Sequence, residues 1–161
     1  MIHFYYPNDE STRFLSGVFD QLQQAISSSE YAIYTFDHNE VPSVIEDIKK
    51  LPNGSNIVYL GHGATHKLYS IHPNDFIDIN SLGLFNNKNL FAIACDSSTL
   101  LKNCFARTTI THSIGFGKLP TGIGEIQNIK KLRNEGITLE NIEQFKECIV
   151  NITSTAFISM V

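Results

Sequence analysis

The sequence is poor in charge and has no long apolar run. Charged residues make up 17% of its 161 positions, and the formal net charge of −4 leaves no basic footprint for nucleic-acid binding. No apolar run approaches the roughly 18–20 residues that a membrane span needs, and residues 1–4 lack the basic region of a signal peptide. We therefore expect a cytoplasmic protein with neither a nucleic-acid nor a membrane partner.

Cysteine is also scarce, and its spacing argues against a disulfide framework. The chain has three cysteines, Cys95, Cys104 and Cys148, and no C-x-x-C pair among them. An odd number of thiols at irregular spacing is typical of reduced cysteines in a cytosol.

Three glycine-based signatures are missing as well. The chain has no G-x-S-x-G hydrolase elbow, no G-x-x-x-x-G-K-[ST] phosphate loop and no strand-linked G-x-G-x-x-G. Gly115 and Gly117 have no third glycine, and Gly122 and Gly124 fall in a predicted loop. We expect no nucleotide chemistry and no cofactor.

What the sequence does contain is an alternation of strand and helix patterns. A hydrophobic content of 42% over 161 residues predicts a globular chain, which we interpret as a single domain over residues 1–161. Strands are predicted at residues 2–6, 31–36, 56–60, 89–94 and 108–116, and helices at residues 12–28, 41–51, 79–85, 97–105, 126–134 and 138–157. Residues 61–75 and 115–124 are predicted as loops. This order is typical of an α/β sandwich of three layers, with helices on both faces of a mostly parallel sheet.

Two of these strands end in side chains suited to catalysis. Residues 57–60 lead into Gly61-His62-Gly63, and residues 90–94 lead into Cys95-Asp96. Ligands of an open α/β sheet bind beyond the carboxyl ends of its strands, so parallel neighbouring strands would bring His62 and Cys95 together there.

Such a pair predicts acyl transfer. Cys95 is the candidate nucleophile and His62 the candidate base, which later acts as the acid for the leaving amine. The backbone N–H groups of Gly63 and Cys95 are candidates for the oxyanion hole. A helix beginning near residue 97 would place its positive end beside Cys95 and favour the thiolate.

Two motifs of the chain resemble those of the caspase-like cysteine peptidases, most nearly the bacterial CHAT branch. They are Leu60-Gly61-His62-Gly63 and Leu90-Phe91-Ala92-Ile93-Ala94-Cys95-Asp96-Ser97. The resemblance covers about residues 56–119. It implies a flavodoxin- or caspase-like sheet of order 2-1-3-4-5, with the histidine after the third strand and the cysteine after the fourth. It also implies cleavage of a protein or peptide substrate after a selected residue. CHAT sequences usually carry Ser or Thr and then Gly where this chain has Ser97-Ser98.

Three carboxylates are candidates for substrate binding. In a 2-1-3-4-5 sheet, Asp9 follows the strand beside that of His62 and could recognise a basic side chain through a charge-assisted contact. Asp37 and Asp96, which follow two other strands, are rivals. Each could instead cap a helix or stabilise a turn.

Several alternatives stay open. Zinc could be held by His62 and His66, with His72, Cys95 or Asp75 completing the set of ligands. The i, i+4 spacing of His62 and His66 places both rings on one face only in a helix, which Gly61 and Gly63 disfavour. We therefore expect no metal. A non-catalytic binding or scaffold module with a vestigial pair is a second alternative, and a cysteine hydrolase of small molecules is a third. For a peptidase we expect control by an activating or inhibiting partner, a blocked crevice, or a change in the 115–124 loop.

Overall fold

The structure is a computed structural model that describes residues 1–129 and 135–161. It consists of two compact units. The first contains Met1–Arg13 and Ser28–Lys118, and the second contains Phe14–Ser27 and Leu119–Val161. The single domain expected over residues 1–161 stays a prediction.

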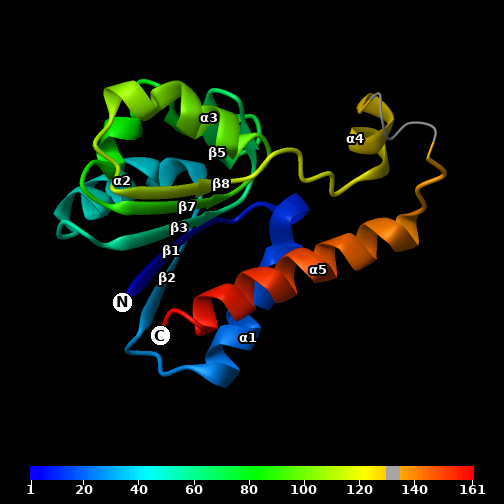
Figure 1. Ribbon diagram of the computed structural model, residues 1–161, viewed down its shortest axis with the longest axis horizontal. Helices are drawn as coiled ribbons and strands as arrows, with labels where there is room; N and C mark the ends of the chain where they lie inside the picture. Colours follow the sequence, from blue (N-terminus) through cyan, green and yellow to red (C-terminus); the bar gives the residue numbers. More distant parts are fainter. Residues whose placement is uncertain (130–134) are drawn as a thin grey trace. The chain divides into compact units, whose positions relative to one another are not determined.

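A five-stranded parallel sheet forms the framework of the first unit. Its strands are β1 (Ile2–Pro7), β2 (Tyr31–Phe36), β3 (Asn56–Leu60), β7 (Asn89–Ile93) and β8 (His112–Gly115), in the order β2-β1-β3-β7-β8 (Figure 1). Every neighbouring pair is parallel. Numbered among themselves, these strands have the expected order 2-1-3-4-5. The predicted α/β class and parallel sheet are therefore confirmed.

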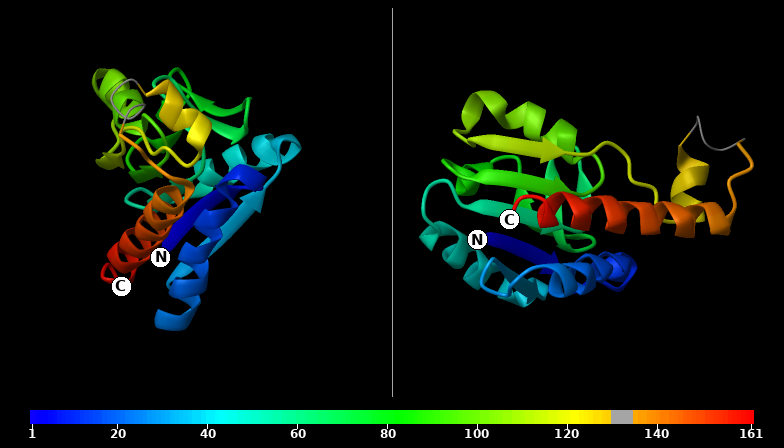
Figure 2. Two further views of the ribbon diagram at one scale, coloured as in Figure 1. Left: turned by 90° about the vertical axis from the view of Figure 1, so that its right-hand side faces the viewer. Right: turned by 60° about the horizontal axis from the view of Figure 1, so that its bottom comes forward.

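Helices α2 (Val41–Lys50) and α3 (Ser97–Cys104) cover one face of this sheet, together with the 3-10 helix η3 (Leu82–Phe85) (Figure 2). Two further 3-10 helices lie at helix ends, η2 (His38–Glu40) before α2 and η4 (Phe105–Arg107) after α3. The core cluster on this face combines apolar side chains of the strands and helices: Tyr5, Val44, Ile48, Tyr59, Leu82, Phe85, Leu90, Ala92, Leu100 and Leu101. The apolar side chains that alternate along the strands therefore pack against the apolar faces of the helices.

The predicted loop at residues 61–75 is wrong, because this segment begins a second sheet. Strands β4 (Gly63–Ala64), β5 (Lys67–Ile71) and β6 (Asn74–Asp78) pair antiparallel in the order β4-β5-β6. Their alternation is obscured in the sequence because the buried position 70 is a serine and the register of β5 with β6 is irregular at two places.

Several predicted boundaries also differ. The predicted short helix at residues 79–85 is η3 alone, and the predicted strand at 108–116 shortens to β8. The predicted helix at 12–28 divides into the 3-10 helix η1 (Glu10–Ser16) and helix α1 (Gly17–Ala25). Of the predicted helix at 126–134, the structure has α4 (Ile123–Asn128), while residues 130–134 lie outside the described residues.

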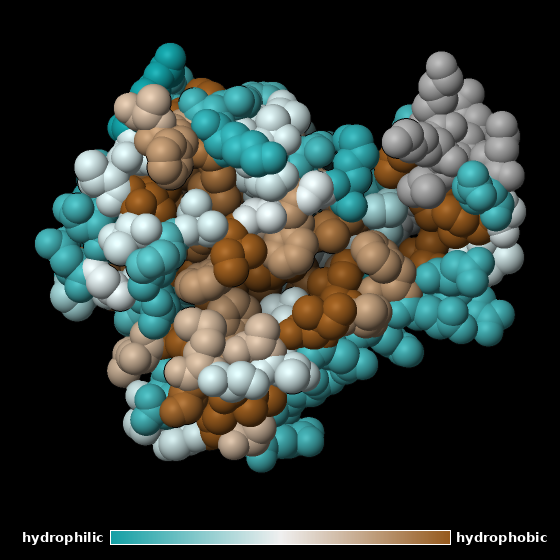
Figure 3. Space-filling model, viewed as in Figure 1, coloured by the Kyte–Doolittle hydropathy of each residue, from teal (hydrophilic) through white to brown (hydrophobic). Residues whose placement is uncertain are grey.

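The second unit is helical. Helix α5 (Leu139–Ile158) packs against α1, where a Cβ atom on Gly17 would lie 3.2 Å from Cγ1 of Val150. Thr138 caps α5, because its Oγ1 accepts a hydrogen bond of 3.3 Å from the amide of Asn141. Figure 3 shows hydrophilic residues along one side of α5 and hydrophobic residues along the other. Among residues 1–129 and 135–161, no helix combines the length and apolar character of a membrane span.

Candidate functional site

Strands β3 and β7 are parallel neighbours whose last registered pair is Leu60 and Ile93. The amide of Gly61 extends this ladder by donating to the carbonyl of Ile93 at 3.2 Å. Counting two residues on from the registered pair reaches His62 on one chain segment and Cys95 on the other. The two predicted catalytic residues therefore follow adjacent strands at equivalent positions.

Gly63 lies against the backbone of Cys95. A Cβ atom on Gly63 would be 2.6 Å from the carbonyl oxygen of Cys95 and 2.9 Å from Cβ of Ala94, so no larger residue fits without a shift. This contact shows that the segments following β3 and β7 stay together beyond the sheet.

The N–H of Gly63 is directed away from its neighbouring strand β5. Gly63 pairs with Leu68, and the adjacent pair of His62 with Tyr69 carries the hydrogen bond, from the amide of Tyr69 to the carbonyl of His62 at 3.1 Å. Bonded and non-bonded pairs alternate in an antiparallel ladder, so Gly63 occupies a non-bonded position. Its N–H is therefore not used by the β4–β5 ladder.

Cys95 is half-buried at the turn from β7 into α3. Asp96 adopts the left-handed conformation with φ of 54°, which reverses the chain and starts the helix. The buried hydroxyl of Ser97 lies 2.7 Å from the carbonyl of Ala92 and accepts a hydrogen bond of 2.8 Å from the amide of Phe116. Ser97 therefore fixes the end of β7, the start of α3 and the segment after β8 to one another.

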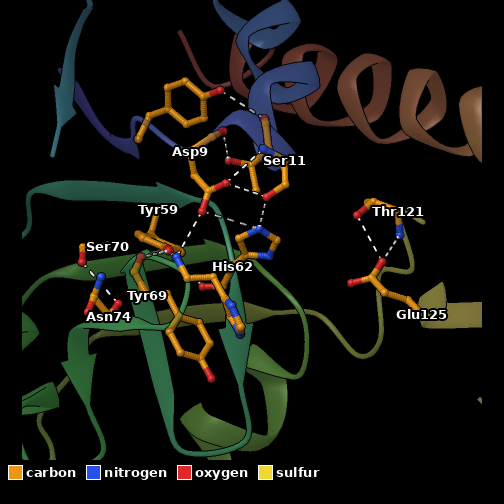
Figure 4. Close-up of polar contacts among 12 residues, drawn as sticks. Asp9, Ser11, Tyr59, His62, Tyr69, Ser70, Asn74, Thr121 and Glu125 are labelled. Carbon is orange, nitrogen blue, oxygen red and sulfur yellow. Dashed lines mark hydrogen bonds and ion pairs between the residues drawn. The ribbon is translucent and has the colours of Figure 1, made fainter. Parts of the chain in front are cut away.

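His62 contacts two side chains that follow β1 (Figure 4). Its Nε2 lies 2.6 Å from Oγ of Ser11 and 3.9 Å from Oδ2 of Asp9. The same Ser11 hydroxyl is 2.5 Å from Oδ1 of Asp9. In this Asp9-Ser11-His62 cluster the imidazole is 22% exposed and the Asp9 carboxylate 11%, so both are largely shielded from solvent, whereas Ser11 is exposed.

The geometry of this cluster sets the direction of its hydrogen bonds. The one hydroxyl proton of Ser11 is best donated to Asp9, because a bond to a carboxylate is stronger than one to a neutral ring nitrogen. Ser11 then accepts from His62, and Nε2 carries a proton. A serine nucleophile needs the opposite arrangement, with the carboxylate on the far ring nitrogen. The cluster is therefore not a serine hydrolase triad.

Asp9 is held as a carboxylate. Burial alone raises its pKa, but hydrogen bonds from the hydroxyl and amide of Ser11 and from the amide of His72, with the charge of His62, bring the pKa below its usual value. The amide of His72 lies 3.1 Å from Oδ2, and its ring is 5.9 Å from that of His62. The negative charge of Asp9 favours a positively charged imidazole at position 62.

The three predicted substrate-binding carboxylates occupy different surroundings. Asp9 lies beside His62, whereas Asp37 follows the edge strand β2, accepts from Nδ2 of Asn8 at 3.2 Å and caps η2. Asp96 lies beside Cys95 and forms an ion pair of 3.0 Å with Lys118. A substrate-binding role for each stays a prediction.

The residues considered for zinc are not assembled as a ligand set. Across residues 1–129 and 135–161, no group of three or more His, Cys, Asp and Glu side chains is placed to hold a metal ion. His66 follows β4 in an exposed turn, and Asp75 forms an ion pair of 2.7 Å with Lys67.

Sequence reasoning missed three residues of this site. These are Ser11, Tyr59 and Ser97, for which the sequence patterns predict no role in the site. The signal for Ser11 was its spacing from Asp9, since an aspartate commonly accepts from the amide two residues on. Tyr59, near the end of β3, and Ser97, at the start of α3, are buried residues whose hydroxyl groups must each find a hydrogen-bond partner.

Comparisons of the chain with protein-family models, with curated proteins and with solved structures find no match.

Proposed function

We propose that this protein is a cytosolic cysteine endopeptidase that uses His62 and Cys95 as a catalytic dyad. The observation that carries the proposal is the register of β3 with β7, in which these two residues follow adjacent parallel strands at equivalent positions. A nucleophile and a base at one sheet edge are the minimum that acyl transfer requires.

In the first step, the sulfur of Cys95 attacks the carbonyl carbon of the scissile peptide bond, and His62 takes up the thiol proton. The negative charge that develops on the carbonyl oxygen is stabilised by the N–H of Gly63 and the N–H of Cys95. The carbon–nitrogen bond then breaks, His62 donates the proton to the leaving amine, and an acyl thioester remains on Cys95.

In the second step, water attacks the thioester while His62 accepts a proton from it. The carbon–sulfur bond breaks, the carboxylic acid product leaves, and the proton returns to the thiolate. Since Nε2 of His62 faces Ser11 and Asp9, the exchange with Cys95 and with water would use Nδ1.

The surroundings of both residues support this chemistry. Asp9 and Ser11 favour the imidazolium, and the amino-terminal end of α3 favours the thiolate of Cys95. Cys104 offers a contrast, because burial raises the pKa of its thiol and it packs in the core. The remaining thiol, Cys148, is exposed on α5.

Labelling with a set of peptidyl acyloxymethylketones, followed by mapping of the modified cysteine, tests the proposal. We expect labelling of half-buried Cys95 and none of the more exposed Cys148, because the probe requires an activated thiolate in a substrate site. His62→Ala should abolish this labelling, and Cys148→Ala should leave it unchanged. Labelling of Cys148 alone would mean that solvent exposure of the thiol, and not activation by His62, determines which cysteine reacts with the probe.

Proteolysis itself is tested by incubating wild-type protein and Cys95→Ala with a proteome and mapping new amino termini. Termini that appear only with the wild type support the endopeptidase. If wild type and Cys95→Ala give the same termini under every activating condition, the non-catalytic scaffold or the small-molecule hydrolase replaces it.

A further inference from the structure

A pocket of the first unit lies at the opposite end of the sheet from His62 and Cys95. It has a volume of about 530 Å³ and lies between α2 and η3, beside the turn that leads into β7. Lys88 immediately precedes β7, whereas Cys95 follows that strand. At about 3.3 Å per residue, the strand separates the two positions by roughly 20 Å. A ligand in this pocket would therefore not touch the proposed dyad.

Lys88 is the unusual residue of this pocket. It lines the pocket, and the whole residue is only 6% exposed, although lysine is rarely buried without a partner. Strand alternation places its side chain on the face of Leu90 and Ala92, which is the face that α2 and η3 cover. Within the part of the chain that the structure describes, its ammonium group has neither an ion pair nor a hydrogen bond.

The rest of the lining is suited to an anion. The lining contains no carboxylate. Besides Lys88 it consists of three apolar residues, one serine, one glycine, three asparagines and a second lysine, namely Ile45, Lys49, Asn53, Ile77, Ser81, Gly83, Leu84, Asn86 and Asn87. Lys49 is already paired with Glu46 at 2.6 Å and is largely exposed, so it belongs to the rim. Lys88 is thus the deep positive charge of the pocket.

Asn86 adds a directed hydrogen-bond donor. Its Oδ1 accepts from the amide of Thr109 at 2.8 Å, which fixes the side-chain amide and presents its NH₂ group as the donor. An unpaired ammonium group on a buried lysine and an oriented amide beside apolar side chains are the elements of a small-ligand site.

We propose that this pocket binds a small organic anion, in which an apolar group is joined to a carboxylate or a phosphate. The anionic group pairs with Lys88 and accepts from Asn86, and the apolar group contacts Ile45, Ile77 and Leu84. The physical reason is that Lys88 is only 6% exposed, so its ammonium group has little access to water and is stabilised by an opposite charge, which no side chain of the described residues supplies. A ligand carboxylate or phosphate does so.

Isothermal titration with phenyl phosphate, benzoate and the neutral benzyl alcohol tests this proposal. We expect saturable binding of at least one of the two anions and none of the alcohol, and the stronger anion tells which headgroup the site takes. Lys88→Met should weaken that binding by ~10-fold or more, as expected for a lost charge-assisted bond. Lys50→Met is the control for the loss of one lysine charge, because Lys50 is exposed on α2, where it pairs with Asp47 at 3.0 Å, and does not line the pocket.

Two further measurements keep the proposal open to contradiction. Ligand-free Lys88→Met should unfold at the same temperature as the wild type or higher, because the substitution removes an unpaired charge from a residue that is only 6% exposed. If that variant fails to fold, amide spectra of the wild type decide, with phenyl phosphate or benzoate expected to shift Ser81 and Asn86. Failure of either anion to bind the wild type, equal affinity of Lys88→Met, or shifts confined to other regions would overturn it. Cys95→Ala should bind the anion with the affinity of the wild type, so the experiment tests this site independently of the proposed peptidase activity.

Discussion

The hydroxyl of Tyr59 lies 2.9 Å from the carbonyl oxygen of His62 and 2.5 Å from that of Tyr69. Tyr59 is fully buried, and burial raises the pKa of its hydroxyl well above the usual value, so the group stays a neutral donor. It joins the segment after β3 to strand β5 and holds the backbone of His62 in place. Tyr59 is therefore a positioning residue for the candidate site.

Tyr59→Phe should lower both stability and activity. Loss of this hydroxyl donor leaves two part-buried carbonyl oxygens less well satisfied, although that of His62 still accepts from the amide of Tyr69, and we expect the free energy of unfolding to fall by about 1–3 kcal/mol. Urea denaturation measures this change. The rate of Cys95 labelling should fall as well, while His62→Ala abolishes it. An unchanged labelling rate in a destabilised Tyr59→Phe would assign the hydroxyl to folding alone.

Tyr5→Phe is expected to have the opposite effect on stability. The hydroxyl of Tyr5 is buried and has no hydrogen-bond partner among residues 1–129 and 135–161, and burial raises its pKa. Removing an unsatisfied buried hydroxyl should increase the free energy of unfolding by about 1 kcal/mol. The same urea titration compares it with Tyr59→Phe. Destabilisation of Tyr5→Phe would show that this hydroxyl does have a partner in solution.

Gly63→Ala should disturb the candidate site through backbone contact. The added methyl group would meet the carbonyl oxygen of Cys95 at 2.6 Å, so the segments after β3 and β7 must separate. We expect a loss of about 1–3 kcal/mol in stability, typical of overpacking, and a slower reaction of Cys95 with the acyloxymethylketone probe.

Gly117→Ala is the matched control for this substitution. Gly117 also lies near the start of α3, where its carbonyl accepts from the amide of Asp96 at 2.8 Å, but a Cβ atom there meets nothing within 4 Å. Its stability and probe reactivity should remain close to those of the wild type. Equal effects of Gly63→Ala and Gly117→Ala would mean that the close approach of Gly63 to Cys95 does not matter.

The main sheet was predictable because its signals are local. Four of its five strands, β1, β2, β3 and β7, are short and largely apolar runs bounded in the sequence by turn residues, and helical stripes lie between most of the strands. The positions of His62 and Cys95 after their strands follow from the same runs. The β4-β5-β6 sheet was missed because a serine occupies a buried strand position and the pairing contains irregularities. The contact of Ser11 with His62 joins residues far apart in the chain, and no periodicity encodes it.

The acid stability of the protein should depend on Asp9. Its folded-state pKa is lowered, so ionised Asp9 contributes stability that is fully present above the ordinary value of 3.8 and is lost as the pH falls from there through the folded-state pKa. Asp9→Asn removes this contribution, since an amide does not ionise. The variant should be less stable than the wild type at neutral pH, and the difference should shrink as the solution is acidified below pH 3.8. Urea midpoints measured from neutral to acidic pH follow this change. Asp20→Asn, at an exposed position of α1, is the control and should leave the pH dependence unchanged. A stability gap between wild type and Asp9→Asn that is constant with pH would mean that the carboxylate charge contributes nothing to the Asp9-Ser11-His62 cluster.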